Sequence, residues 1–495
     1  MRKRLHRLRR QSGFPGARRP TDGPAEQPEG NARKRSRTTR QWTAAAATLA
    51  AAGLVLAGCA SSDSEGGGSA SGTWPGEGKS ECKGLEQLAD FGDLTGKTVS
   101  VYTSILPPEQ QAQEDSYKLF TTCTGAKVKY EGSDQFETQL VVRVKAGNAP
   151  DIAYIPQPGL LKTVVSSGSA VEAPSQVSDN VDKWFGEDWR SYGSVDDKLY
   201  AAPLGASVKS FVWYSPKMFA DNGWTVPETW DDMIALSDKM VQKGIKPWCA
   251  GFESGDATGW PGTDWLEDTL LRSAGADVYD QWVNHDIPFN DSKVEEALDD
   301  VGTILKDDKY VNGGFGDVNS IATTAFQDGG LPILKGDCGM YRMASFYAAQ
   351  WPEGTDVSEG GDVFAFYLPT MSDEFGKPVL GGGEFTTAFS DRQEVQAFQT
   401  YLSTDVWANE KAKATPGGGW VSANKGLDIA NLSSPIDKLS AETFQDPNAI
   451  FRFDGSDQMP SAVGAGSFWK EMTAWITGES TKDALTNVEN SWPAS

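Results

Sequence analysis

Histidine is almost absent from this chain of 495 residues, which contains only His6 and His285. Cysteine is scarce as well, and the five cysteines form no Cys-x-x-Cys pair. Zinc sites and thioredoxin-like redox sites need such groups. The sequence also has no Walker glycine-lysine motif, and Gly464-Ala465-Gly466 does not follow a strand as a dinucleotide-binding loop does. We therefore expect no metal site, no cofactor and no bound nucleotide.

Long apolar runs are lacking too, and the most apolar stretch, 41–57, is short for the roughly 20 residues of a membrane-spanning helix. This stretch follows a basic segment and ends in Leu56-Ala57-Gly58-Cys59, which resembles the cleavage and acylation site of bacterial lipoproteins. The sequence predicts a signal peptide over 1–58 and a lipid on Cys59, which would hold the exported protein at the outer face of the cell membrane. A transmembrane helix is the alternative, and the start codon and the export route stay open.

Basic residues are far fewer than acidic residues in the chain that follows the expected signal peptide. Residues 1–58 hold 13 Lys and Arg against 3 Asp and Glu, so the rest of the chain carries 32 basic and 65 acidic residues, a net charge of −33. Such a surface repels nucleic acid and anionic lipid, so we expect neither as a partner and expect membrane contact through the lipid alone. The same charge disfavours an anionic ligand.

Glycine, serine and acidic residues dominate 59–80, which reads as a flexible tether. Beyond it, β-rich runs at 98–102, 127–130 and 151–155 are separated by helical patterns at 109–122 and 136–147. This alternation predicts an α/β fold with a parallel sheet. Ligands bind at the carboxyl ends of such strands. Three polar residues that follow the strands are therefore site candidates: Ser104, Asp134 and Gln157.

Further elements continue the α/β pattern. The run 211–214 predicts another strand, and Thr229 and Asp291 (or Ser292) are placed to cap helices. Helical patterns also cover 392–404 and 468–477.

Six stretches in this order resemble the extracellular solute-binding proteins of carbohydrate ABC importers, the family of maltose-binding protein, and among them the alpha-glucoside type. They are Ala146-Gly147-Asn148-Ala149-Pro150-Asp151-Ile152-Ala153, Tyr200-Ala201-Ala202-Pro203, Lys209-Ser210-Phe211-Val212-Trp213-Tyr214, Pro227-Glu228-Thr229-Trp230, Val379-Leu380-Gly381-Gly382-Gly383-Glu384-Phe385 and Phe453-Asp454-Gly455-Ser456-Asp457. The resemblance implies two lobes with the ligand between them and crossings near 200–205, 379–383 and 416–420. Lobe 1 would comprise 81–203 and 380–416, and lobe 2 would comprise 204–379 and 417–495.

The resemblance also bears on the cysteines. Cys82, Cys123, Cys249 and Cys338 allow three pairings in an oxidising compartment. We favour Cys82–Cys123 and Cys249–Cys338, because each pair then lies inside one lobe. Free buried thiols are the alternative.

Aromatic rings stack on the C–H faces of sugars, and carboxylates, amides and backbone groups bond the hydroxyls. The 17 tryptophans suit such chemistry. By position the resemblance implies stacking by Trp260 and Trp469, although either ring could serve packing alone. The glycine-rich crossings and their neighbours complete the candidate ligand-binding set: Ser207, Glu253, Gly382, Gly383, Glu384 and Trp420. Lys209 lies nearby and is either a ligand contact or a surface charge.

The resulting expectation is a monomeric, non-enzymatic receptor that captures a small sugar and delivers it to the permease of an ABC importer. Where maltose-binding protein has an aromatic and charged pair after its Pro-Asp-Ile strand, this chain has Ile155 and Gln157. This departure leaves the identity of the sugar open. The alternatives are a non-sugar ligand and a secreted glycoside hydrolase, which needs two carboxylates across the scissile bond.

Overall fold

The fold is described from a computed structural model over residues 73–493. The expected signal peptide 1–58, the expected acylation site Cys59 and most of the expected tether 59–80 lie outside these residues. Within 73–493, no helix combines the length and the apolar character that crossing a bilayer requires.

Five strands form the first sheet, in the spatial order β2 (Lys127–Gly132), β1 (Thr98–Thr103), β3 (Ile152–Ile155), β13 (Phe385–Ala388) and β6 (Ala201–Pro203). β1 is parallel to both β2 and β3, as the alternation of strands and helices predicts. β13 comes from much later in the chain and lies antiparallel between β3 and β6. The carboxyl ends of β1, β2 and β3 therefore meet at one edge of this sheet.

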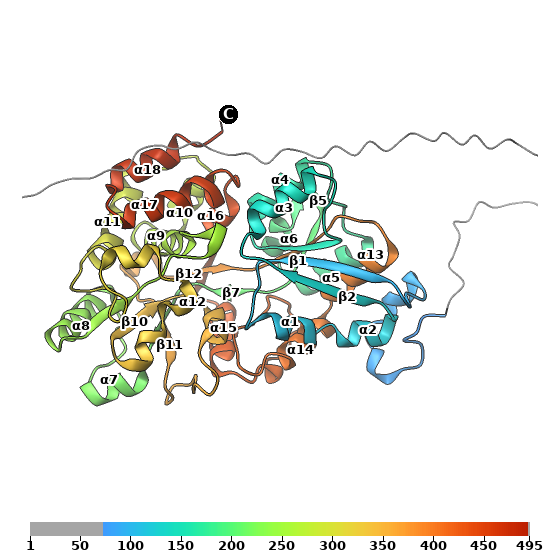
Figure 1. The fold of residues 1–495 in the computed structure, drawn as a ribbon, viewed down its shortest axis with the longest axis horizontal. Coiled ribbons are helices and arrows are strands. Elements are labelled where there is room, and N and C mark those ends of the chain that lie inside the picture. The colour runs from blue at the N-terminus through green and yellow to red at the C-terminus, as the bar shows by residue number, and fades with distance from the viewer. Residues whose placement is uncertain (1–72, 494–495) are drawn as a thin grey trace, which may run out of the picture. The chain divides into compact units, whose positions relative to one another are not determined.

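Eight helices accompany the first sheet (Figure 1): α1 (Gln110–Asp115), α2 (Lys118–Thr124), α3 (Phe136–Lys145), α4 (Pro158–Ser166), α5 (Ser175–Trp184), α6 (Glu187–Tyr192), α13 (Gln393–Leu402) and α14 (Asp405–Lys413). The expected helix over 109–122 is two helices. The break lets the Ser116 hydroxyl accept from the Trp407 indole N–H at 3.0 Å, and Tyr117 and Tyr154 join their hydroxyls at 2.7 Å. A hairpin of β4 (Ser194–Val195) and β5 (Lys198–Leu199) precedes β6.

The second sheet has the order β11 (Phe364–Tyr367), β8 (Phe211–Tyr214), β10 (Cys338–Arg342) and β9 (Lys246–Cys249). Thr229 and Asp291 cap α8 and α11 as predicted, accepting from the backbone N–H groups of Asp232 and Lys293. The helices around this sheet are α7 (Pro216–Asn222), α8 (Trp230–Gln242), α9 (Trp260–Ser273), α10 (Ala276–Val283), α11 (Ser292–Leu305), α12 (Phe326–Gly329), α16 (Gly455–Gln458), α17 (Trp469–Ile476) and α18 (Thr481–Glu489).

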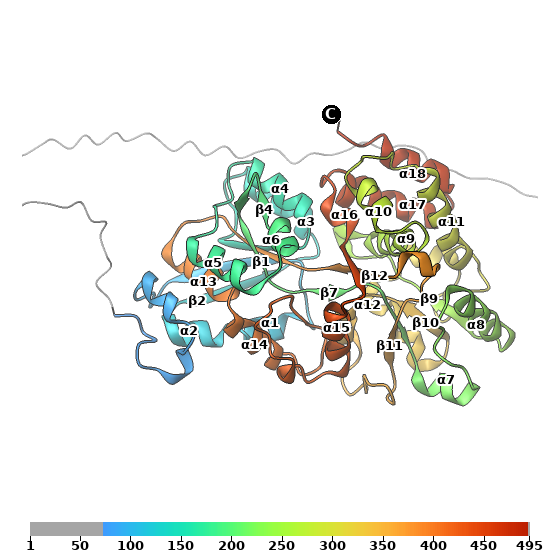
Figure 2. The same cartoon turned by 180° about the vertical axis from the view of Figure 1, so that it is seen from behind.

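A third sheet joins the two groups of elements. Its order is β14 (Ala449–Phe453), β12 (Lys377–Gly382) and β7 (Ser207–Val208), with β12 parallel to β14 and antiparallel to β7. In both views β7 and β12 run between the two larger sheets (Figure 2). The chain thus forms two lobes, each with its own sheet and apolar core.

Packing bears on where the third passage between the lobes lies. Trp420, Val421 and Leu432 all pack in the core of the first lobe. The helix α15 (Pro435–Gln445) and β14 follow, and Met459 packs in the core of the second lobe. We therefore propose a passage over 435–453 in place of the sequence-based boundary at 416/417.

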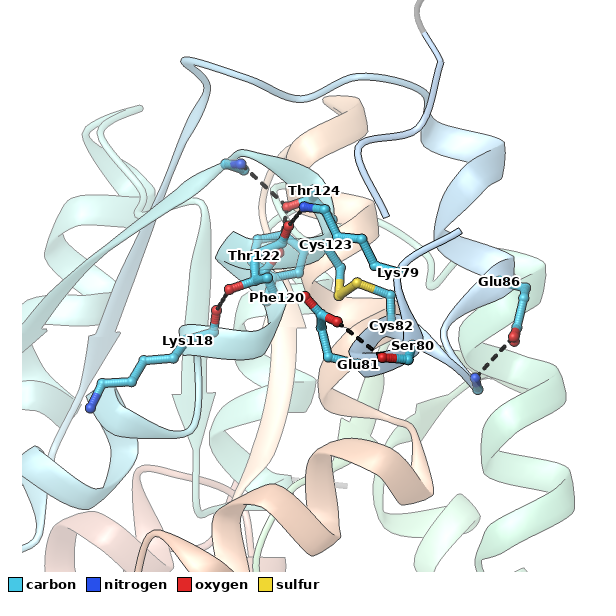
Figure 3. The surroundings of a disulfide bond; sticks show 12 residues. Lys79, Ser80, Glu81, Cys82, Glu86, Lys118, Phe120, Thr122, Cys123 and Thr124 are labelled. Carbon is cyan, nitrogen blue, oxygen red and sulfur yellow. Dashed lines mark hydrogen bonds between the residues drawn. A yellow bond between two sulfur atoms is a disulfide. The ribbon is translucent and has the colours of Figure 1, made fainter. Parts of the chain in front are cut away.

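Two disulfides form in the structure, in the pairing that the sequence analysis favours. Cys82 joins Cys123 with the Cα atoms 5.7 Å apart, and Cys249 joins Cys338 at 5.9 Å. The first bond fastens the N-terminal end of the described chain to α2, where the Lys79 ammonium also donates to the Thr122 carbonyl oxygen at 2.8 Å (Figure 3). The second bond links the neighbouring strands β9 and β10. Each disulfide therefore stabilises one lobe.

Candidate functional site

A cavity of about 340 Å³ lies between the two lobes. This volume is within the roughly 300–1,000 Å³ typical of small-molecule sites. The first lobe contributes residues at the carboxyl ends of β1, β2 and β3, together with α3. The second lobe contributes α9, α16, α17 and the loop before α9. The crossings add Ser207, Lys209, Gly383 and Glu384.

The structure brings nine of the eleven predicted ligand-binding residues to this cavity: Ser104, Asp134, Gln157, Ser207, Glu253, Trp260, Gly383, Glu384 and Trp469. Gly382 and Trp420 are not among the lining residues. A Cβ on Gly382 would come within 3.0 Å of the Lys209 side chain, so Gly382 makes room for that lysine. Trp420 packs edge-on against Trp407 at 5.7 Å inside the first lobe.

Two tryptophans reach the cavity from neighbouring helix starts. Trp260 is half-buried, with the rings of Phe326 and Phe346 at 5.2 and 6.0 Å. Trp469 is 3% exposed, and within residues 73–493 its indole N–H has no hydrogen-bond partner. Gly259 allows the two helices to approach, because a Cβ there would lie 2.0 Å from the Trp469 carbonyl oxygen and its φ is +113°.

The abundance of tryptophan serves mainly the cores. Six tryptophans are fully buried away from the cavity: Trp213, Trp248, Trp265, Trp282, Trp407 and Trp475. The count of tryptophans therefore does not itself indicate a binding site, whereas their position after glycine-rich loops does.

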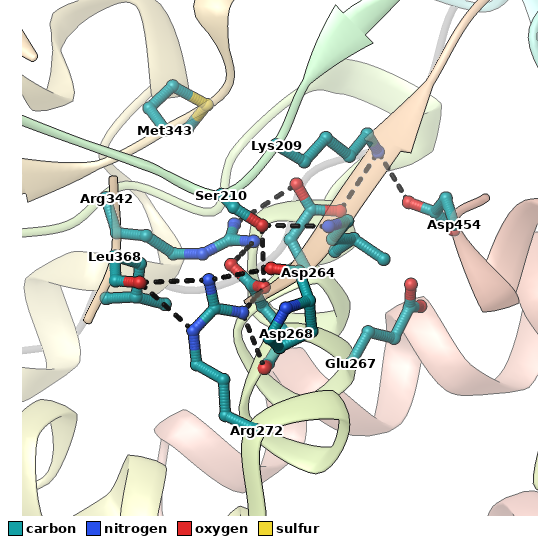
Figure 4. Close-up of polar contacts among 12 residues, drawn as sticks. Lys209, Ser210, Asp264, Glu267, Asp268, Arg272, Arg342, Met343, Leu368 and Asp454 are labelled. Atoms are coloured by element: carbon teal, nitrogen blue, oxygen red, sulfur yellow. Dashed lines mark hydrogen bonds and ion pairs between the residues drawn. The ribbon is translucent and has the colours of Figure 1, made fainter. Parts of the chain in front are cut away.

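A layer of buried charges supports the second-lobe wall (Figure 4). Asp264 and Asp268 lie one turn apart on α9, fully buried, and Arg342 of β10 donates to both at 3.2 and 3.1 Å. Arg272 donates to Asp268 from the next turn of α9. Lys209 completes the layer through ion pairs with Asp264 and Asp454. Because buried charges are costly unless they are paired, this layer fixes α9 against the crossing strands.

Lys209 is buried and lines the cavity rather than being a surface charge. Burial alone would lower the pKa of its ammonium group, but Asp264 and Asp454 hold the pKa well above its ordinary value. An ammonium group has three N–H donors, and two are taken by these carboxylates. The third can serve a molecule in the cavity.

Most of the ionisable groups that line the cavity are carboxylates. In the described part of the chain, seven carboxylates and one ammonium line it. Burial raises the pKa of Glu137 to about 7, and burial together with Glu384 raises the pKa of Glu109 to about 8. Burial next to Asp454 also raises the pKa of Asp457 well above its ordinary range. The lining thus suits a neutral molecule rich in hydroxyl donors and disfavours an anion.

Several lining residues escaped the sequence analysis. Phe326, Phe346 and Gln350 come from segments without a recognisable pattern, and Glu109 and Glu137 sit at helix starts that face inward. Asp457 ends the matched stretch 453–457 and could have been chosen on that ground. Among residues 73–493, no group of three or more His, Cys, Asp or Glu side chains is arranged to hold a metal ion.

Two lobes joined by crossing segments around a cavity lined by carboxylates and aromatic rings define the class of two-lobe ligand-binding proteins. The sequence profile of the bacterial extracellular solute-binding proteins matches residues 103–405. The chain belongs to this family, and it is a binding protein rather than an enzyme.

Individual relatives agree with this assignment. The chain is 38% identical to the osmoprotective compounds-binding protein GgtB of Synechocystis, over 81% of this chain and 94% of the relative. It is 35% identical to the alpha-glucosides-binding periplasmic protein AglE of Rhizobium meliloti, over 82% and 90%. Among solved structures, the fold resembles the bacterial solute receptor AcbH (TM-score 0.67, 18% identity, 80% of this chain and 98% of that one). It also resembles a chitin oligosaccharide binding protein (TM-score 0.65, 18% identity, 79% and 97%).

Proposed function

We propose that this protein is a lipid-anchored receptor that captures a small neutral glycoside, an alpha-glucoside foremost, and delivers it to the permease of an ABC importer. The name of AglE supports the choice of alpha-glucosides. The name of GgtB supports a second candidate ligand, a small osmoprotective solute. Both candidates are compatible with a cavity that disfavours anions.

The observation that carries the proposal is the combination of rings and unpaired polar atoms in one cavity. Trp260, Phe326 and Phe346 form an aromatic group that can cover the C–H face of a sugar ring. Among residues 73–493, the buried Trp469 indole N–H has no acceptor and the buried Gln157 side-chain oxygen has no donor. A buried polar group without a hydrogen-bond partner lowers the stability of the folded protein. A polyhydroxylated ligand supplies both the missing acceptor and the missing donor.

The charges that line the cavity narrow the expected ligands to neutral molecules. The one lining ammonium, among the described residues, is already neutralised by Asp264 and Asp454. A phosphorylated or uronic sugar would therefore meet uncompensated carboxylates such as Asp134 and Glu253. We expect neutral sugars to bind and their anionic derivatives to be rejected.

Calorimetry tests this proposal directly. The mature protein is titrated with alpha-linked and beta-linked glucose disaccharides, sugar phosphates, amino acids and short peptides. We expect saturable binding of an alpha-linked disaccharide without turnover, accompanied by a change in tryptophan fluorescence as the cavity loses water. Binding of a peptide or an amino acid with no heat from any sugar would contradict the sugar assignment.

The anchor needs a separate test, because Cys59 lies outside the described residues. The motif Leu56-Ala57-Gly58-Cys59 and the tether that follows it support acylation. In cells, Cys59→Ala should release the protein into the medium. A Cys59→Ala protein that remains on the membrane at the wild-type level would contradict the lipid anchor and leave the ligand proposal untouched.

A further inference from the structure

Two short segments from opposite lobes meet beside the cavity. The 3-10 helix Gly255–Ala257 belongs to the second lobe, and Asp134 and Thr138 lie at the start of α3 in the first. The Asp256 backbone N–H donates to the Asp134 carbonyl oxygen at 3.0 Å. The Thr138 hydroxyl donates to the Asp256 carboxylate. The lobes are thus bonded directly to each other at this point.

Gly255 makes the approach possible. Its φ is +58°, and a Cβ would lie 2.4 Å from the Asp134 carbonyl oxygen, so both the backbone conformation and the contact require glycine. Ser254 and Gly255 line the cavity together with Ser133 and Asp134. The contact between the lobes is therefore part of the cavity wall.

A second direct bond between the lobes also borders the cavity. The Gln350 amide donates to the Glu109 carboxylate at 2.8 Å, and both side chains are lining residues. A bound sugar chain cannot extend between the lobes at Asp134–Asp256 or at Glu109–Gln350 without breaking the hydrogen bonds there.

We infer that Gly255–Asp256 and Asp134–Thr138 form a clasp that closes the cavity wall around the ligand, retains it, and selects a glycoside short enough to be enclosed. This inference rests on the proposed function and adds the length of the ligand to it. The clasp bonds exist only while the lobes are together, so they favour the closed state and slow release. A longer oligosaccharide would hold the clasp open and lose these bonds.

The test uses Thr138→Val, which removes the hydroxyl donor and keeps a similar shape. Thr122→Val is the matched control, since Thr122 is an exposed helical threonine of the same lobe that bonds the Lys118 carbonyl oxygen. Stopped-flow fluorescence measures release of the alpha-linked disaccharide that binds the wild type most tightly. We expect roughly tenfold faster release from Thr138→Val, as for loss of a hydrogen bond to a charged group, and wild-type release from Thr122→Val. Affinity for maltotetraose relative to that disaccharide should rise in Thr138→Val.

Hydrogen exchange provides a measurement that needs no ligand. The amide of Asp256 should exchange faster in Thr138→Val than in the wild type, both without sugar and with it, because its acceptor lies across the lobe boundary. If the wild type binds no sugar, the proposed function fails. The difference in exchange between the two ligand-free proteins then still tests whether the clasp forms. The clasp would be overturned by equal Asp256 amide exchange in the two proteins. It would also be overturned if Thr138→Val left both the rate of sugar release and the preference for the shorter sugar unchanged.

Discussion

The two walls of the cavity are built differently. The first-lobe wall is made of strand ends and the start of α3, and in the described part of the chain it offers hydroxyl, amide and carboxylate groups but no aromatic ring. The second-lobe wall carries the rings of Trp260, Phe326, Phe346 and Trp469, and a buried layer of ion pairs lies behind it. The comparison leads us to propose that the second wall offers rings for stacking on a sugar, whereas the first offers polar groups for hydrogen bonds to its hydroxyls.

The largest effect is expected from breaking the buried layer behind the second wall. Lys209→Met leaves Asp264 and Asp454 buried with a lost partner, which should lower the free energy of unfolding by about 3–5 kcal/mol. Denaturant unfolding of the ligand-free protein measures this change. The matched control is Lys198→Met, which removes an exposed lysine from its pair with Glu172 and should leave the midpoint near wild type. Equal unfolding midpoints for Lys209→Met and Lys198→Met would mean that the layer of buried charges does not stabilise the second wall.

Removing a ring from the second wall should weaken binding and spare the fold. Trp260→Ala should cost about 1–3 kcal/mol of binding free energy, a tenfold to hundredfold loss of affinity, because an aromatic contact at a buried site is lost. Calorimetry measures the affinity, and circular dichroism should stay near wild type. Trp224→Ala is the control, since Trp224 is a partly exposed tryptophan of the same lobe that does not line the cavity. Normal sugar binding by Trp260→Ala would move the stacking role to Trp469.

A pH-dependent effect is expected on the first wall. Burial raises the pKa of Glu137 from 4.5 to about 7, so the folded protein binds this proton more tightly than the unfolded chain. The ionised carboxylate therefore destabilises the fold increasingly between about pH 4.5 and 7 and by a constant amount above that. Glu137→Gln should be more stable than the wild type at pH 8, and the difference should vanish near pH 4.5. Unfolding midpoints across this range measure it, and a constant difference would argue against a raised pKa.

The smallest effect should come from one hydroxyl of the first wall. Ser104→Ala removes a single hydrogen-bonding group at the end of β1 and should reduce affinity roughly two- to tenfold, the scale of about 0.5–1.5 kcal/mol for one hydrogen bond. Calorimetry with the same sugar measures the loss. If Ser104→Ala reduced affinity as much as Trp260→Ala does, the groups of the first wall would not contribute to binding as independent hydrogen bonds.

The two walls also differ in how far the sequence predicts them. Three residues of the first wall, Ser104, Asp134 and Gln157, follow from the strand–helix alternation, because the carboxyl ends of parallel strands share one edge. Trp260 and Trp469 came from the resemblance. Gly382 and Trp420 belong to glycine-rich crossing segments, and such a segment does not tell which of its residues face the cavity.

Contacts between distant segments lay beyond such reasoning. Asp264 and Arg342 are 78 residues apart, and only packing brings them together. The position of Lys209 depends on that layer, so its role stayed open in the sequence. Phe326 and Phe346 reach the cavity from short helices without a periodic pattern. The fold and about a third of the lining residues could thus be predicted, whereas the layer of buried charges required the structure.

The central claim is that a sugar binds between these two walls. A crystal structure of the mature protein with the alpha-glucoside that binds most tightly tests it most directly. The account predicts a sugar ring against Trp260, an acceptor oxygen of the ligand at the Trp469 indole N–H, and hydroxyls on Asp134 and Gln157. A ligand bound elsewhere, or a sugar in the cavity without contact to either tryptophan, would contradict it.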